Sequence, residues 1–285
     1  MGLAYPLQKF QDWLTQQWVI ITGKKINPDD MPWLMGPFGN VNGIGEAFIQ
    51  QLAQKENLVI ERNTLSQGLI PSFDLLNLPA SDLSCLSWKV IDFYEKTAEY
   101  NLDFSVQWNP FFKFFGILVN KLFSSRINQL HIPTRNIKNA ESLKSEIITL
   151  THPVSNQVKY TIWLRTFAAS GQVIYSGIYG TCTLPSGQTC IKAVFPLPQG
   201  NATVIMVPGV TSAGELVLES SGKKPGDAGF YFLLNDSKGN YWSKYVSSFR
   251  DRLTIRQEDD HLSAEQVLTL WRKKVLKFNY KISLK

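Results

Sequence analysis

The chain has 285 residues, of which 44% are hydrophobic and 18% charged, the balance of a globular protein whose core needs no disulfide staples. Aromatic residues make up 12%, more than packing alone usually requires, and such residues often line apolar pockets, although a merely aromatic core is the simpler interpretation. The formal net charge of +6 is scattered apart from a basic C-terminal run, so we expect no nucleic-acid partner, which would need a continuous basic stripe.

The compartment is predicted from what the sequence lacks. Residues 1–10 do not show the charged and apolar regions of a signal peptide, and no charge-free apolar run is long enough to span a bilayer. The cysteines are Cys85, Cys182 and Cys190, and such a small, odd number is typical of a reducing environment. We therefore expect a cytoplasmic protein with reduced thiols.

Helical spacing of apolar residues predicts four helices in the first half, separated by segments rich in Gly, Pro and Asn. They are Phe10–Val19, Gly45–Gln54, a helix from Ser81 or Ser84 to Thr97, and Phe111–Leu130. Ser81 with Asp82 is expected to cap the third helix. The fourth is apolar on nearly all sides and is therefore expected to be buried; the alternative, a helix in a membrane interface, would need a stronger polar face.

From about Lys144 the hydrophobic pattern alternates, which predicts consecutive antiparallel strands bounded by turns. They are Glu146–Thr151, Val158–Phe167, Gln172–Tyr179, Cys190–Leu197, Thr203–Val207, Glu215–Glu219, Gly229–Asn235, Phe249–Gln257 and Val275–Ile282. The close spacing of these short strands indicates a sandwich or a barrel. We predict an α+β fold: a helical, loop-rich region over residues 1–143, packed on an antiparallel β-meander over residues 144–285 as one integrated unit. The meander is expected to be a barrel of the lipocalin or calycin type, or a strongly curved sheet.

The turns also predict strand register, and register sorts the side chains by face. The predicted opposite pairs are Leu150 with Val158, Arg165 with Tyr175, Trp163 with Gly177, Tyr179 with Ala193, and Cys182 with Cys190. One face then carries Ile147, Thr149, Thr161, Trp163, Arg165, Phe167, Tyr175, Tyr179 and Phe195. The other face is aliphatic and is expected to pack against the helices.

The mixed aromatic face suits a pocket for a bulky, largely apolar ligand, because amphipathic rings there surround a few convergent polar groups. The alternative is a solvated face, where the same residue types are common in strands. The predicted ligand-binding residues are Trp163, Tyr175, Tyr179, Phe195, Trp108 and Tyr231.

Acid–base chemistry would need an ionisable group near that pocket. Asp251 lies among Phe249 and Leu253, and Glu146 lies beside Ile148, each on the apolar parity of its strand. A carboxylate buried there would have a raised pKa or a paired arginine. We therefore name Glu146, Asp251 and Arg165 as the candidate catalytic residues.

Other motifs carry little chemistry. Gly43-Ile44-Gly45 precedes a helix but lacks a preceding strand and the third glycine of a dinucleotide site. The three histidines are far apart, and no metal-binding spacing is present, so we expect neither a metal nor a cofactor. Cys182 and Cys190 could form a disulfide only in an oxidising compartment.

The leading functional hypothesis is binding of a bulky, largely apolar small molecule in an aromatic-lined cavity. The first alternative is a cofactor-free cyclase, isomerase or lyase that acts on such a molecule through an acid–base carboxylate and an arginine. The second alternative is a protein or membrane-surface interaction module that uses residues 111–123 or the basic tail.

Overall fold

The computed structural model describes residues 2–6, 10–40, 46–62, 66–113 and 136–285. Within these ranges the α-helices are α1 (Phe10–Thr22), α2 (Glu46–Glu56), α3 (Ala80–Cys85) and α4 (Trp88–Glu95), and short 3-10 helices are η1 (Pro28–Asp30), η2 (Phe73–Leu76) and η3 (Thr97–Glu99). The strands are β1 (Lys24–Ile26), β2 (Val59–Arg62), β3 (Tyr100–Trp108), β4 (Ile137–Thr151), β5 (Val158–Phe167), β6 (Val173–Thr183), β7 (Thr189–Leu197), β8 (Gly200–Val210), β9 (Leu216–Glu219), β10 (Gly229–Asn235), β11 (Tyr241–Tyr245), β12 (Phe249–Glu258), β13 (His261–Leu270) and β14 (Lys273–Leu284).

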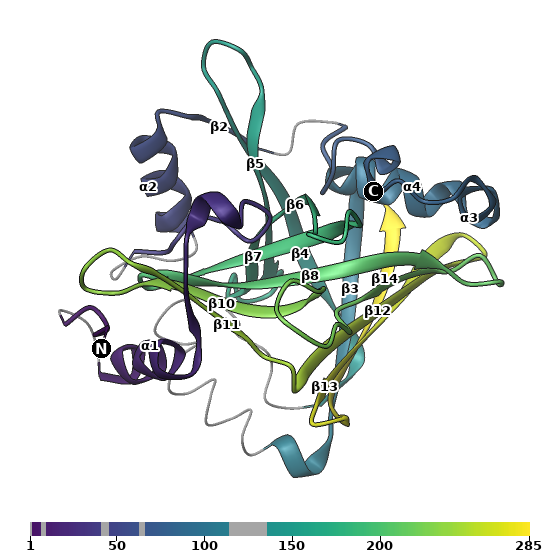
Figure 1. Cartoon of the computed structure of the whole chain (residues 1–285). Helices are drawn as coiled ribbons and strands as arrows, with labels where there is room; N and C mark the ends of the chain where they lie inside the picture. The colour runs from purple at the N-terminus through teal and green to yellow at the C-terminus, as the bar shows by residue number, and fades with distance from the viewer. Residues whose placement is uncertain (1, 7–9, 41–45, 63–65, 114–135) are drawn as a thin grey trace.

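Ten of the described strands form a closed antiparallel barrel (Figure 1). The order around the ring is β8-β7-β6-β5-β4-β3-β14-β13-β12-β9, and β9 pairs back to β8. Closure removes the free edges that an open sheet would expose. The antiparallel barrel predicted from the alternation is therefore confirmed.

Along one edge, strand β8 pairs with two different strands. Its first half pairs with β10, from Gly200 to Ile205, and its second half pairs with β9, from Val207 to Val210. The sheet continues from β10 through β11 to β1, outside the ring. This fork in the pairing of β8 allows a short extension of the sheet, β10-β11-β1, to lie outside the barrel while the ring stays closed.

The predicted helix-rich first half is confirmed only in part, since the described residues are 21% helix and 49% strand. Residues 1–143 hold the α-helices but also supply β1, β2, β3 and the beginning of β4. The predicted helix from Ser81 or Ser84 to Thr97 is two helices, because Leu86 and Ser87 have extended backbone. Ser87, rather than Ser81, provides the cap, and its Oγ accepts a hydrogen bond from the Lys89 amide. Most of the helix predicted for Phe111–Leu130 lies outside the described residues.

The predicted strand pairs are confirmed with one exception. The structure pairs Arg165 with Tyr175, Trp163 with Gly177, Tyr179 with Ala193, and Cys182 with Cys190. Leu150 faces Tyr160 rather than Val158, because a register shift beside Thr151 inserts one residue into β5.

The aromatic face predicted from parity is the inside of the barrel. Ile147 and Trp163 lie opposite each other and belong to the main core, together with Phe104 of β3 and Phe278 of β14. Rings from strands that are not neighbours meet across the interior: Tyr175 and Phe278 have centroids 6.3 Å apart. The interior is therefore partly filled by aromatic side chains.

The aliphatic face points outward and is covered by α2. Phe48, Ile49, Leu52 and Ala53 of this helix pack on a set of buried aliphatic residues from four strands. That set comprises Ile148, Leu150, Ile162, Leu164, Val173, Ile178 and Val194. The prediction that this face packs against helical structure is confirmed, and both faces of this wall are buried.

Other segments cover the remaining apolar parts of the sheet. Trp33 and Leu34 pack on the outer side of β6, β7, β8 and β10, and α1 lies on β10 through Val19 and Ile20. Residues 69–98, which include α3 and α4, join the interior core and close one end of the barrel (Figure 1). Phe93 of α4 contacts both Trp163 and Tyr100 in this plug.

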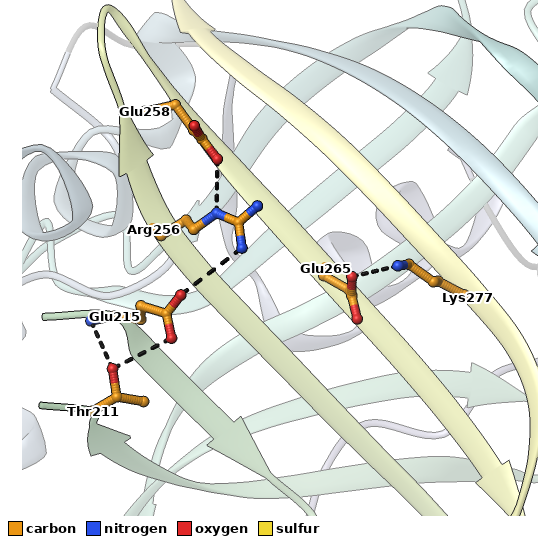
Figure 2. A network of polar contacts seen from close by, with 6 residues as sticks. All are labelled: Thr211, Glu215, Arg256, Glu258, Glu265 and Lys277. Atoms are coloured by element: carbon orange, nitrogen blue, oxygen red, sulfur yellow. Dashed lines mark hydrogen bonds and ion pairs between the residues drawn. The ribbon is translucent and has the colours of Figure 1, made fainter. Parts of the chain in front are cut away.

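The outer face of β12, β13 and β14 is polar (Figure 2). Arg256 Nε lies 2.7 Å from Glu258 Oε1, and its Nη1 lies 3.9 Å from Glu215 Oε1, in the turn before β9. Lys277 of β14 pairs with Glu265 of β13. This wall is thus charged outside, whereas its inner face carries most of its apolar side chains together with a few polar ones.

Candidate functional site: a polar cluster inside the barrel

Arg165 is the charged centre of the barrel interior. It is 6% exposed, and its guanidinium carbon lies 4.0 Å from the ring centre of Trp163 and 4.7 Å from that of Tyr175. Strand geometry explains this arrangement: Trp163 is two residues away on the same face of β5, and Tyr175 is the direct partner on β6. The guanidinium is therefore held against two aromatic rings.

The edge of the same guanidinium is less completely satisfied. Arg165 Nη2 donates a hydrogen bond to Tyr179 Oη at 3.0 Å, whereas the buried Nε has no hydrogen-bond partner. Among the described carboxylates, none forms a salt bridge with Arg165. Burial of a charge without a counter-ion costs several kcal/mol, and cation–π contacts offset only about 2 kcal/mol each.

Asp251 of β12 is the second charged group of the interior. Its Oδ2 accepts a hydrogen bond from Gln266 Nε2 at 2.7 Å, and its buried Oδ1 has no partner. Burial raises the pKa of Asp251 to about 7, although the bond from Gln266 opposes the shift. The carboxyl group is therefore close to half-protonated at neutral pH.

Three tyrosines, Tyr175, Tyr179 and Tyr280, lie close enough to Arg165 and Asp251 for both charges to shift their pKa values. Burial raises the pKa of Tyr280 to about 12 and also raises the pKa of Tyr175 and Tyr179. In each of them the charge of Arg165 lowers the pKa and that of Asp251 raises it. All three hydroxyls are protonated at neutral pH and can donate hydrogen bonds.

Most residues named from the sequence meet in this interior. Arg165 contacts Trp163, Tyr175 and Tyr179, and the ring of Phe195 lies 6.1 Å from that of Tyr175. Asp251 comes from the opposite part of the ring, and Trp108 belongs to the same interior core at the end of β3.

Glu146 and Tyr231 lie elsewhere. Glu146 is on the outward parity of β4, where Oε1 is 2.9 Å from Arg62 Nη1 and Oε2 is 3.5 Å from Lys144 Nζ. Tyr231 packs on Trp33 with ring centres 5.5 Å apart, on the outer side of β10. The alternation along each strand was predicted correctly at both positions. In these strands, however, the outward face is also buried, because other segments cover it.

Gln266 and Tyr280 were not identified from the sequence. Tyr280 Oη lies 3.4 Å from Gln266 Oε1, so the two residues extend the polar cluster from Asp251 toward β14. One signal existed for Gln266, which stands on the apolar parity of β13 between Ala264 and Leu268. Without β13 among the predicted strands, that parity could not be recognised.

The cluster offers hydrogen bonding and charge. In the part of the chain that the structure describes, no group of three or more His, Cys, Asp or Glu side chains is placed to hold a metal ion. Cys182 and Cys190 are free thiols on the outer side of β6 and β7. The described polar cluster comprises the guanidinium of Arg165, the carboxyl group of Asp251, the amide of Gln266 and the phenols of Tyr175, Tyr179 and Tyr280.

The closed sheet and its interior define a β-barrel whose core carries a polar, aromatic-flanked cluster. No family model matches the sequence, and no solved structure matches the chain. The chain is similar to a Bacillus subtilis (strain 168) protein named "Uncharacterized membrane protein YndJ", with 28% identity over 218 residues. The match covers 75% of this chain, but the chain spans only 37% of that relative's length. Over the described residues, no helix combines the length and apolar character needed to cross a membrane.

Proposed function

We propose that the protein binds a bulky, largely apolar small molecule inside the barrel. The observation that carries the proposal is the incomplete burial of Tyr175, Tyr179 and Phe195, although all three point into a closed ring. An inward-facing side chain with accessible surface borders space that water or a ligand can occupy. Aromatic walls with a few convergent polar groups are the usual lining of small-molecule sites.

The catalytic alternative uses the same interior. Asp251 would be its acid or base, since a carboxyl group with a pKa near the working pH suits proton transfer. Binding is the simpler function, because it requires only the lining. It is also the function that must hold before any catalysis in this interior can be tested.

Binding is tested with two neutral, apolar fluorescent probes, N-phenyl-1-naphthylamine and Nile red. We expect saturable binding at one site per chain, weakened about tenfold or more by Phe195→Trp, because the larger ring occupies interior space. The matched control is Phe111→Trp, which makes the same change at an exposed position. Circular dichroism of each variant checks that the barrel is intact. If neither probe saturates on the unmodified protein, the proposal is wrong.

A second candidate function is attachment to a membrane surface, and α1 favours it. Phe10, Leu14, Trp18 and Ile21 are exposed at spacings that align them along one face of the helix, while Val19 and Ile20 face the sheet. Lys24 and Lys25 follow in β1, and Lys244 Nζ lies 5.9 Å from the centre of the Trp18 ring. An apolar stripe beside lysines suits a surface of anionic lipid. The relative named as a membrane protein is compatible with this candidate.

Sedimentation with lipid vesicles tests the attachment. We expect co-sedimentation with vesicles that contain phosphatidylglycerol, and its loss in the double variant Leu14→Ser, Trp18→Ser. The control Trp271→Ser removes an exposed tryptophan from the turn between β13 and β14. If both variants co-sediment with the vesicles to the same extent as the unmodified protein, α1 is not the attachment site.

A further inference from the structure

The buried guanidinium of Arg165 is arranged to receive a planar anion. The rings of Trp163 and Tyr175 lie 4.0 and 4.7 Å from its guanidinium carbon, and a hydrogen-bonding partner must approach through the edge of the group, where its N–H bonds point. That edge contains Nε, which is buried and has no partner. A carboxylate binds guanidinium in this plane, through two parallel hydrogen bonds to Nε and a terminal nitrogen.

The protein does not supply that anion from Asp251. The hydrogen bond to Asp251 Oδ2 comes from Gln266, and no described carboxylate forms a salt bridge with Arg165. Asp251 also comes from β12, on the part of the ring opposite β5, which carries Arg165. The positive charge of the interior is therefore left without a counter-ion from these strands.

The neighbouring hydroxyls add to the preference for an anion. Tyr179 and Tyr280 both accept hydrogen bonds from Arg165. Both are protonated at neutral pH because burial raises their pKa, so both can donate hydrogen bonds to a negatively charged head group. Beyond them the interior is apolar, with Phe104, Phe167 and Phe278 in contact.

We propose that the ligand is an amphipathic carboxylate, whose head group pairs with Arg165 and whose apolar part lies among the aromatic side chains of the barrel. This inference rests on the binding function proposed above and adds the chemical class of the ligand. A phosphate or sulfate head group is tetrahedral and larger, so we expect it to fit less well beside the rings of Trp163 and Tyr175. A cationic head group is excluded by charge.

Displacement of the neutral naphthylamine probe by matched twelve-carbon compounds tests the inference, at concentrations below those at which they aggregate. We expect dodecanoate to bind about 10- to 100-fold more tightly than dodecanol, as charge-assisted hydrogen bonds in a buried site provide. Dodecyl phosphate should bind more weakly than dodecanoate, and dodecyltrimethylammonium should bind most weakly of the four.

Variants assign this preference to Arg165. Arg165→Gln should retain the affinity for dodecanol and lose the preference for dodecanoate, while Arg165→Lys should keep part of it, because lysine retains the charge but not the two parallel bonds. The control Arg252→Gln removes an exposed arginine from the outer face of β12 and should leave the preference unchanged. Removal of an unpaired buried cation is not expected to unfold the barrel, and Arg165→Met provides a second neutral variant of similar length.

The outcomes separate the two proposals. If dodecanol and dodecanoate bind equally, or if the preference persists in both Arg165→Gln and Arg165→Met, the carboxylate inference is wrong and the binding function stands. Tighter binding of dodecyl phosphate than of dodecanoate would also overturn it. If none of the compounds displaces the probe and the probe itself does not bind, the binding function is wrong.

Discussion

Asp251 and Arg165 lie in the same barrel, yet each is held by neutral partners. Gln266 holds the carboxyl group, and two aromatic rings with a phenol hold the guanidinium. A direct salt bridge would lower the pKa of Asp251, whereas burial raises it. The separation therefore keeps one group positively charged and allows the other to change its charge near neutral pH.

Stability should depend on pH because of Asp251. Its pKa rises from 3.8 to about 7 on folding, so between these values the folded state binds one more proton than the unfolded state. The free energy of unfolding should therefore fall with increasing pH, by about 1.4 kcal/mol per unit, and level off above pH 7. Urea unfolding of the unmodified protein and of Asp251→Asn, between pH 4 and pH 8, measures this slope.

The free energy of unfolding of Asp251→Asn should change less with pH. Above pH 7 this variant should be more stable than the unmodified protein, since an amide keeps an acceptor for Gln266 and cannot ionise. Asp259→Asn, in an exposed turn, should follow the unmodified protein. Parallel curves for all three proteins would show that Asp251 is already ionised in the folded state at low pH.

The cysteines should differ sharply in reactivity. Burial raises the pKa of Cys182 to about 11 and that of Cys190 to about 12, whereas Cys85 is exposed. The thiolate is the reactive form, so Ellman's reagent at pH 8 should titrate one thiol quickly in the native protein and three after denaturation. The Cys85→Ser variant should show no fast phase. A fast phase that persists in this variant would mean that the wall of β6 and β7 opens readily.

The alternation of residues along each strand sorted the side chains correctly into two faces. It could not show which of the two faces points into the barrel. The same argument, an acidic residue on the apolar parity of its strand, selected both Asp251 and Glu146. Asp251 is inside, whereas the apolar parity of β4 near Glu146 is the outer face, which α2 covers. Which face of a strand points inward depends on the neighbours that cover it, and strand periodicity contains no information about them.

At the level of single strands, Gly177 shows how closely the interior of β6 is packed. A Cβ at this position would lie 2.8 Å from Phe195 and 3.0 Å from Tyr179, both of them ring atoms. Gly177→Ala should therefore destabilise the fold by about 1–3 kcal/mol and displace these two rings. Thermal unfolding and near-ultraviolet circular dichroism measure the two effects.

The control for this prediction lies three residues along the same strand. A Cβ at Gly180 would meet no atom within 4 Å, so Gly180→Ala should change stability little. The same loss of stability in both variants would point to a backbone requirement of β6 instead of contact with the rings.

Individual elements were predictable where pattern and turn chemistry agreed. The predicted bounds of β5 and β10 match those observed, since alternating apolar residues in each are followed by a clear turn. Strand β13 was missed because polar residues such as Gln266 occupy inward positions, which breaks the alternation. Strand β3 was missed because its partner β14 is distant in sequence, so no local turn identifies it.

At the scale of the whole molecule, the ring closes at β9, its shortest strand with four residues. Leu218 of β9 is buried in the interior core. On the outside, Arg252 of β12 pairs with Glu219, and Arg256 pairs with Glu215, the second pair being shown in Figure 2. Two kinds of interaction therefore hold the closing strand, and they can be compared by mutation.

Burial should contribute more to closure than the exposed ion pairs. Leu218→Ala should lower the free energy of unfolding by about 2–5 kcal/mol, because it leaves a cavity in the core. Arg256→Ala should lower it by about 1 kcal/mol or less, and this effect should shrink in 1 M salt. Urea unfolding at low and high salt measures both. A larger effect from Arg256→Ala would mean that the surface network determines closure.

The overall class of the fold followed from the sequence, but closure did not. The density of short strands indicated a barrel or a curved sheet. The fork in β8 and the pairing of β3 with β14 depend on contacts between residues far apart in the chain, which no local pattern specifies. Helices from the first half were expected to pack against the barrel or to close one end of it, but the helical pattern could not indicate that residues 69–98 form the plug.

The pairing of β3 with β14 has a consequence for synthesis on the ribosome. Trp108 to Tyr100 pair with Leu276 to Leu284, so β3 has no partner on this edge until a segment much further along the chain has been translated. Until then the nascent chain can form only an open, curved sheet, with an unpaired edge at β3 and with Arg165 and Asp251 exposed to water. Such long-range closure is slow, and unpaired edges promote aggregation, so the interval before β14 emerges is when this chain depends most on chaperones.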